Sequence, residues 1–314
     1  MQPRRRARRQ VDGVLVLDKP PGMTSNAALQ TARRLLNAAK AGHTGTLDPM
    51  ATGLLPLTFG EATKFSQMLL DADKTYEACI QLGVSTDTGD AEGTVLERRP
   101  VAFDVGDVAQ LEQVLACFRG EIEQVPPMYS ALKRDGKPLY EYAREGVEVE
   151  RTARRVTIHA LDLLAVDREQ ARLTVRVSSS KGTYIRSLAM DIGEKLGCGA
   201  HLCALRRTAI GPLRLDEAVT LAQLEAVDEP ARDALLAPPD RLVEVFPAVR
   251  LDESQARTIL HGQGLSDVPD GPQGLVRLYH GQRFLGLGER QGDGHVLPKR
   301  LIATSDQAVA VRND

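Results

Sequence analysis

Long apolar runs, regularly spaced cysteines and cofactor-binding motifs are all missing from this 314-residue sequence. Without a long apolar run, no segment is suited to cross a membrane as a helix. The basic start, MQPRRRARRQ, is followed by no apolar stretch of signal-peptide length. Four cysteines without a framework spacing predict a reduced, cytoplasmic protein that lacks disulfides.

Net charge is also small, at −2, because 40 Lys and Arg face 42 Asp and Glu. As an average, this value argues against a nucleic-acid partner. The charges are nevertheless segregated, since five arginines lie among the first nine residues and segment 176–207 carries an excess of four positive charges. Phosphate binding requires a local cationic surface and not a positive total. Each cluster alone also fits a solvated face, so charge by itself leaves an RNA partner open.

The length predicts two domains. Composition changes near 237–240 and again at Phe246-Pro247, where we place the boundary. We expect a basic, disordered tail at 1–12, a first domain at 13–246 and a small β-barrel at 247–314. The polar segment 124–146 is expected to be a protruding insertion.

Apolar periodicity predicts the main elements of both domains. Segment 75–82 alternates most clearly, with Tyr76, Ala78 and Ile80 on one face. The predicted strands are 13–17, 54–59 and 75–82, with strand-like patterning again at 156–177, and 275–278, 284–288 and 297–301 near the C-terminus. Thr24, Ser25 or Asn26 is predicted to cap a first helix, and two further helices are predicted over 108–118 and 184–196.

The densest unusual segment runs from Gly42 to Gly53 and reads GHTGTLDPMATG. Its glycines and proline exclude regular helix or strand and predict a shaped loop. Pro49 biases Asp48 towards extended backbone. A carboxylate held in this way is suited to act as a nucleophile, a general base or a metal ligand, although most loop Asp-Pro pairs only cap a turn.

Three ordered motifs strongly resemble the TruB family of bacterial tRNA pseudouridine-55 synthases. They are KPPGMTS at 19–25, GHxGxLDPxAxG at 42–53 and KGTYIRSL at 181–188. The resemblance runs from about Gly13 to Arg207 and resumes in the C-terminal segment, which looks like an RNA-binding PUA domain. The arginine-rich extension before Gly13 is not part of it.

The resemblance implies a mixed α+β pseudouridine synthase fold, with a central, mostly antiparallel sheet flanked by helices and a small C-terminal β pseudobarrel. It implies isomerisation of uridine 55 in the T loop of tRNA, without metal or cofactor. The partner would be the tRNA T stem-loop, with no membrane and no obligatory protein partner. We therefore expect a cytoplasmic monomer.

Residue roles follow from the same resemblance. Asp48 corresponds to the essential carboxylate, and the target base must first leave its stack to reach it. The residues matched to substrate contacts are His43 for the T loop, Tyr76 for stacking on the flipped uracil and Leu205 for a backbone contact to it. Lys19 and Pro20 are expected to buttress the pocket.

Tyr184 and Arg186 match the third motif, but their geometry depends on where the helix begins. If a strand continues through them, they share a face, and Arg186 can pair with Asp48 while Tyr184 lines the pocket. If the helix has begun, they are separated by roughly 200° and cannot both point inward. The resemblance favours the first arrangement.

Two other motifs point to rival chemistries. Asp87-Thr88-Gly89 spells the aspartic-protease tripeptide, but no second copy supplies the required partner aspartate, and we interpret it as a polar turn. Cys198, His201 and Cys203 match no standard zinc spacing.

The remaining rival is a tRNA-binding or tRNA-folding factor without chemistry. The path after base flipping stays open among attack at C1′, addition to the uracil and a glycal route.

Overall fold

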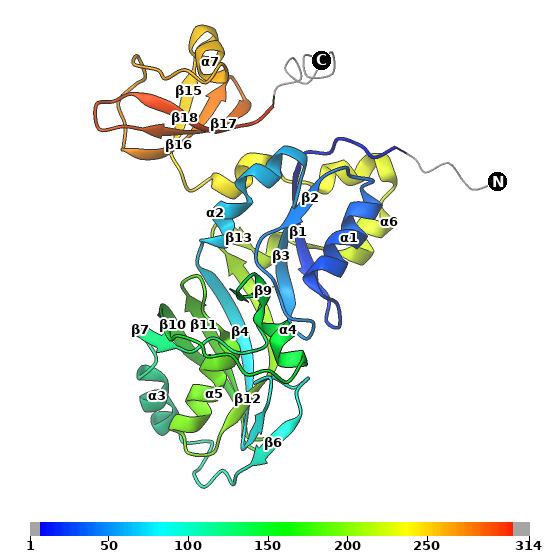
Figure 1. Cartoon of the computed structure of the whole chain (residues 1–314), viewed down its shortest axis with the longest axis vertical. Helices are drawn as coiled ribbons and strands as arrows, with labels where there is room; N and C mark the ends of the chain where they lie inside the picture. Colours follow the sequence, from blue (N-terminus) through cyan, green and yellow to red (C-terminus); the bar gives the residue numbers. More distant parts are fainter. Residues whose placement is uncertain (1–6, 304–314) are drawn as a thin grey trace, which may run out of the picture.

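A ten-stranded sheet forms the centre of the molecule in this computed structural model, which describes residues 7–303 (Figure 1). Eight strands follow in the order β14-β1-β3-β12-β4-β11-β10-β7, while β2 joins β3 and β13 joins β12. The pairs β1–β14 and β3–β12 are parallel and the others antiparallel, so the predicted mostly antiparallel sheet is confirmed. Its strands are β1 (Gly13–Lys19), β2 (Ala41–His43), β3 (Thr52–Phe59), β4 (Lys74–Leu82), β7 (Gly120–Gln124), β10 (Arg154–Asp167), β11 (Arg172–Ser179), β12 (Ala200–Ile210), β13 (Leu213–Arg214) and β14 (Val219–Thr220).

Burial explains why the sequence signal differs among these strands. In β4, buried and half-buried residues alternate without interruption, which places Tyr76, Ala78 and Ile80 on the core face. β1 is buried along almost its whole length because both of its faces are covered: Leu15 and Leu17 belong to one hydrophobic cluster and Val14 and Val16 to another. Its apolar run therefore shows no alternation.

Helices cover the sheet in two groups. Thr24 caps α1 (Ser25–Leu35) by accepting a hydrogen bond from Ala27 N, and α1 packs against α6 (Leu221–Ala226). α3 (Val108–Ala116) and α5 (Ile185–Lys195) contact each other, while α3 packs on β10 and α5 on β12. Within residues 7–303, no helix is long and apolar enough to cross a membrane.

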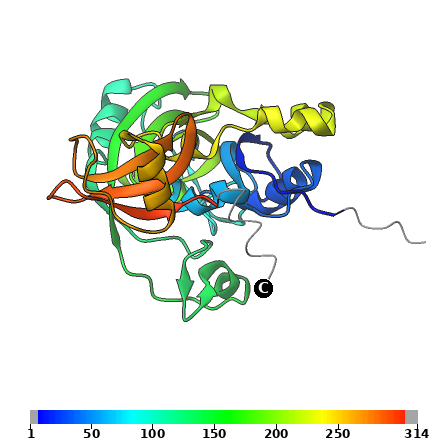
Figure 2. The same cartoon turned by 90° about the horizontal axis from the view of Figure 1, so that it is seen from above.

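The expected insertion extends away from this body, as Figure 2 shows. It contains the hairpin of β8 (Lys133–Arg134) and β9 (Lys137–Pro138), followed by α4 (Leu139–Arg144). A second hairpin, β5 (Val84–Thr86) and β6 (Val95–Arg98), lies at the far end of the molecule in Figure 1.

The C-terminal segment forms its own sheet in the order β15-β16-β17-β18. The strands are β15 (Ala248–Leu251), β16 (Gly274–His280), β17 (Arg283–Arg290) and β18 (Val296–Leu301). The last three match the predicted strands, whereas β15 and α7 (Glu253–Leu260) were not predicted.

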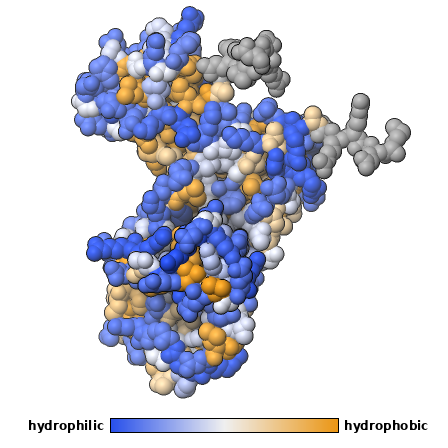
Figure 3. Space-filling model, in the orientation of Figure 1, coloured by the Kyte–Doolittle hydropathy of each residue, from blue (hydrophilic) through white to orange (hydrophobic). Residues whose placement is uncertain are grey.

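The C-terminal sheet contacts the first domain: Phe284 packs against Phe65, just before α2 (Ser66–Leu70), with ring centroids 5.4 Å apart. Figure 3 shows a mostly hydrophilic face with small hydrophobic patches.

The predicted disordered tail needs a correction. Arg4, Arg5 and Arg6 lie outside the described residues, but residues 7–12 pack on the body. Arg9 N donates to Asn37 O at 2.7 Å, its guanidinium pairs with Asp233, and Val11 is 5% exposed. Paired charge and apolar burial therefore hold the second half of this segment in place.

Candidate active site

The Asp48 loop connects β2 to β3, and the first sequence motif holds it in place. Leu47 N donates to Ser25 Oγ at 2.8 Å, and the Ser25 hydroxyl donates back to Leu47 O at 3.0 Å. Pro49 O accepts hydrogen bonds from Gly22 N at 2.9 Å and from Lys19 Nζ at 3.3 Å. Backbone groups on both sides of Asp48 are thus fixed. None of these hydrogen bonds uses the Asp48 carboxylate, so the loop is held in place while the carboxylate stays free to face the pocket.

Lys19 is completely buried beneath this loop. Its ammonium group also donates to Pro20 O at 2.9 Å and Met23 O at 2.6 Å. Burial lowers the pKa of Lys19, while the nearby Asp48 charge raises it. These contacts agree with a supporting role for Lys19. Pro20 lines a separate cleft with Asp18 and Arg206 and does not line the Asp48 pocket.

Arg207 braces the loop from the neighbouring strand β12. Its side chain is 1% exposed, and it donates from Nε to Leu54 O at 2.7 Å and from Nη2 to Gly45 O at 3.1 Å. Gly53, with φ of +96°, lets the two backbones approach, since a Cβ there would lie 2.3 Å from Arg207 O. The glycine spacing of the second motif therefore has a packing cause.

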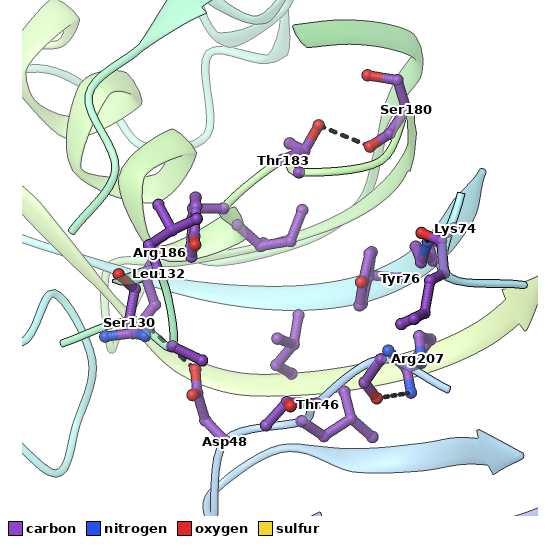
Figure 4. A pocket seen from close by; sticks show the side chains of 18 residues that line it. Thr46, Asp48, Lys74, Tyr76, Ser130, Leu132, Ser180, Thr183, Arg186 and Arg207 are labelled. Carbon is purple, nitrogen blue, oxygen red and sulfur yellow. Dashed lines mark hydrogen bonds and ion pairs between the residues drawn. The ribbon is translucent and has the colours of Figure 1, made fainter. Parts of the chain in front are cut away.

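A pocket of about 360 Å³ opens above Asp48 (Figure 4). Tyr76 and Leu205 line it from the neighbouring strands β4 and β12, and Tyr184 and Arg186 line it at the start of α5. Ser130, Ala131 and Leu132 of the insertion complete one wall. The structure thus brings together five of the predicted residues: Asp48, Tyr76, Tyr184, Arg186 and Leu205.

Arg186 is the cation that faces Asp48. Its Nε lies 3.0 Å from Asp48 Oδ2 and 3.6 Å from Asp90 Oδ2. The other guanidinium nitrogens donate to Thr88 O at 2.9 Å and Tyr129 O at 2.6 Å. With 6% of its side chain exposed, Arg186 is locked, whereas Asp48 keeps 37% exposed towards the pocket. Such a pair leaves the carboxylate accessible and gives it one orientation.

Burial and charge act against each other on Asp48. Burial is the largest influence and raises the pKa of this carboxyl, and the charge of Asp90 raises it further. The charge and hydrogen bond of Arg186 lower it, but the net shift is upward. The fold therefore holds Asp48 in a state that is costly to ionise, as is common for functional carboxylates.

The favoured strand geometry for Tyr184 and Arg186 is wrong, because α5 already begins at Ile185. Both side chains nevertheless line the pocket. Tyr184 is the cap residue, with extended φ and ψ of −99° and 110°, so helical angular spacing does not apply to it. Gln124 fixes this conformation, since its amide accepts from Tyr184 N at 3.0 Å and donates to Tyr184 O at 3.3 Å.

His43 does not line the pocket. It ends β2, where it is half-buried and pairs with Leu57 of β3. Burial and the charge of Arg207 lower the pKa of its ring, and its buried Nδ1 has no hydrogen-bond partner among the described residues. The lowered pKa favours the neutral ring, which keeps an unsatisfied polar atom.

Several residues that support the site carry no signal in the sequence. Thr88 lies in the Asp87-Thr88-Gly89 turn and Asp90 directly follows it, in a pattern that is that of a simple polar turn. Asp90 is 4% exposed, and its Oδ1 accepts from the Thr88 hydroxyl at 2.7 Å and from Glu92 N at 3.1 Å. Gln124, Lys74 and Arg207 were also missed. Each is a buried polar residue, and burial of one polar side chain leaves no periodic signal.

Metal-site geometry is lacking in the part of the chain that the structure describes, where no group of three or more His, Cys, Asp or Glu converges. His201 Nδ1 lies 2.9 Å from Val84 O, and the Cys198 thiol contacts Gly199 O at 3.4 Å. His201 and Cys198 of the possible zinc pattern thus make separate contacts to backbone oxygens.

Family comparisons cover most of the chain. The model of the TruB family pseudouridylate synthase N-terminal domain matches residues 33–185. Models of the tRNA pseudouridylate synthase B C-terminal domain and of the pseudouridine synthase II TruB C-terminal domain match 186–244 and 247–302. The tRNA pseudouridine synthase B of Aromatoleum aromaticum is 65% identical over 300 residues, which are 96% of either chain. This chain belongs to the TruB family. A second relative of the same name, from an Azoarcus species, is 66% identical over 95% of this chain and 97% of its own.

This TruB chain is similar in structure to chains that were solved as parts of larger complexes. A Cbf5-Nop10-Gar1 complex matches with 29% identity and a TM-score of 0.70, covering 94% of this chain and 86% of the matched one. An H/ACA RNP bound to a substrate RNA containing 2′-deoxyuridine matches with 27% identity, a TM-score of 0.69 and the same coverage. The pseudouridine synthase fold expected from the sequence is thereby confirmed for the TruB chain.

Proposed function

We propose that this chain converts uridine 55 in the T loop of tRNA to pseudouridine and that Asp48 is the essential carboxylate. The single observation that carries the proposal is the Asp48–Arg186 pair, which presents a partly exposed carboxylate to a pocket in a TruB-family fold. Conversion of uridine to its C-glycoside isomer consumes no redox equivalent, so one carboxylate, a shaped pocket and a base-flipping surface suffice.

Roles for the pocket residues follow from position. Tyr76 lies on β4, beside the strand β12 that carries Leu205. The tyrosine ring suits stacking on the flipped uracil, and the Leu205 backbone suits contact with the edge of that base. Tyr184 closes the opposite side. Arg186 keeps Asp48 ionised and aimed at the sugar. His43 lies outside the pocket at the end of β2, and its half-buried ring is placed to contact the T loop that surrounds the flipped base.

A transcript assay tests the reaction. Unmodified tRNA transcript incubated with the enzyme is expected to gain one pseudouridine, at position 55. A matched transcript with cytidine at 55 should gain none. Pseudouridine is counted by mass spectrometry of nuclease fragments. Modification of a different uridine, or none in the first transcript, would contradict the proposed substrate position.

Asp90 provides a pH test of the site. Loss of activity on the acid side is expected where Asp48 becomes protonated, above the ordinary aspartate pKa of about 3.9. Asp90→Asn removes a negative neighbour, which lowers the Asp48 pKa and moves the acid limb of kcat/KM to lower pH. The plateau should fall at the same time because Arg186 loses a partner. Asp87→Asn, in the same turn but outside the ion pair, is the matched control.

We also propose that residues 247–314 form a PUA-like RNA-binding domain following a catalytic domain at 13–246. Arg283 on β17 and Arg300 on β18 are exposed there. The double variant Arg283→Ala, Arg300→Ala should raise KM for tRNA and reduce the slope of log Kd against log salt by about 1 for each phosphate that is no longer neutralised. Saturated kcat should not change. Arg98→Ala, on β6 at the opposite end of the molecule, serves as the control (Figure 1).

The chain is proposed to act in the cytoplasm as a monomer, without an obligatory protein partner. Support comes from Asp48, Tyr76 and Arg186, which the fold of this chain already brings together around one pocket. Turnover of transcript by the purified chain alone, eluting at monomer size, is the expected result. A requirement for a second protein would contradict it.

A further inference from the structure

Two cysteines from distant parts of the sequence meet on the central sheet. Cys79 lies on β4 and Cys203 on β12, and their Sγ atoms are 2.7 Å apart. A disulfide bond needs about 2.05 Å between the sulfurs, together with neighbouring backbones. All four cysteines of the chain are free thiols in the structure, so this pair is a dithiol.

A β-bulge brings the two side chains together. The ladder pairs Leu202 with Ile80 and Ala204 with Cys79, which leaves Cys203 as the extra residue between them. The bulge thus adds a thiol beside Cys79 on the face turned away from Tyr76, Ala78 and Ile80. Both cysteines are partly exposed. Cys79 also lines an open cavity of about 280 Å³ on that face, through which a small reagent reaches the sulfur.

Position assigns different roles to the two thiols. Cys203 Sγ lies 2.7 Å from Cys79 Sγ and 3.2 Å from Cys79 O. The neighbouring thiol and the charge of Arg172 lower the pKa of Cys79. Cys79 lines the open cavity and Cys203 does not, so Cys79 is the sulfur that a small disulfide meets first, and Cys203 lies beside it to resolve the mixed disulfide.

We infer that Cys79 and Cys203 are a modification site that a small-molecule disulfide of the glutathione class converts to an intrachain disulfide. The Cys79 thiolate attacks one sulfur of the reagent, forms a mixed disulfide and releases one thiolate. Cys203 then loses its proton to solvent, attacks Cys79 Sγ and releases the second thiolate. Two protein thiols are oxidised by two electrons, and one small disulfide is reduced to two thiols.

The bond ties together the strands that carry Tyr76 and Leu205. It closes between neighbouring strands at the bulge, so it restrains the bulge without moving the strands apart. Because the linked residues are far apart in sequence, the bond also restricts the unfolded chain. A higher Tm of the oxidised protein is the expected physical consequence.

The other two cysteines supply internal controls. Cys117 is exposed at the end of α3, where its thiol contacts Gln113 O at 3.4 Å and lies beside no other cysteine in the described residues. It should form only a mixed disulfide. Cys198 is 1% exposed, and burial raises its pKa, so it should stay unmodified in the folded enzyme. Each cysteine therefore has a distinct expected fate.

Peptide mapping of the full chain after treatment with oxidised glutathione tests the inference. We expect a Cys79–Cys203 cross-linked peptide lacking two hydrogens, glutathione on Cys117, and a Tm several degrees above that of the reduced enzyme. Dithiothreitol should reverse all three changes. In Cys203→Ser, Cys79 should retain glutathione and Tm should not rise, whereas Cys117→Ser should leave the cross-link intact. The inference is overturned if Cys79 and Cys203 both stay free while Cys117 reacts, or if wild-type Cys79 retains glutathione.

Discussion

Asp48→Asn is expected to abolish pseudouridine formation, lowering kcat by roughly 10⁴-fold or more, while tRNA affinity stays within a few-fold of wild type. Asparagine keeps the shape of the side chain and an oxygen that accepts from Arg186 Nε, but it cannot act as a nucleophile or base. Single-turnover assays measure the chemistry, and filter binding measures the affinity. Comparable conversion by Asp48→Asn would contradict the mechanism.

The same variant separates the enzyme from a tRNA-binding or tRNA-folding factor, since a factor without chemistry loses nothing measurable at Asp48. Stability provides a check on its folding. The pKa of Asp48 is higher in the folded than in the unfolded chain, so its ionisation at neutral pH destabilises the fold. Tm of Asp48→Asn should therefore equal or exceed that of wild type. Asp104→Asn, in an exposed loop where Asp104 accepts from Gly106 N, is the control.

Arg186→Lys is expected to lower kcat by roughly 10²-fold to 10³-fold, with a smaller effect on KM. The guanidinium reaches Asp48, Thr88 O and Tyr129 O in three directions at once, and a lysine ammonium cannot reproduce that planar fork. Asp48 then keeps a positive neighbour but loses its fixed orientation. Rapid-quench turnover at saturating tRNA measures the loss.

Lysine is the informative replacement because alanine would leave the buried Asp90 and the partly exposed Asp48 without their cation, at a cost of up to about 3–5 kcal/mol in stability. Arg176→Lys, at an exposed ion pair with Glu77, is the matched control. The double variant Arg186→Lys, Asp90→Asn should lose less than the two single losses combined, since both act through one network. A turnover for Arg186→Lys within threefold of wild type would show that Asp48 needs no orientation by Arg186.

Regular elements with one buried face were predictable from sequence, as β4 illustrates with its unbroken alternation. β12 was not predicted, because the bulge at Cys203 and the buried side chains of His201 and Arg207 interrupt its apolar pattern. β15 and α7 were missed because each is short, and their burial depends on strands that follow later in the chain.

The site divides in the same way. Asp48 and the residues that share its pocket were identified through motif resemblance, and the contacts of Lys19 and Ser25 now explain why the motifs occur together. Asp90 could not be predicted, since its contact with Arg186 forms only when the turn between β5 and β6 meets the start of α5 in space. The strand geometry favoured for Tyr184 and Arg186 was wrong because the amide of Gln124, far away in sequence, holds only Tyr184 extended before α5 begins.

The position of β12 between β3 and β4 also dictates when the enzyme becomes active during folding. The hydroxyl of Thr52 meets Leu205 O across 153 positions of sequence, and Leu205 joins Tyr76 in lining the pocket only when β12 has paired with β4. Pairings of such long range are slow to form, because the entropy of closing the chain is lost before any contact offsets it. A nascent chain that has not yet released β12 from the ribosome therefore carries Asp48 and Tyr76 without a pocket between them.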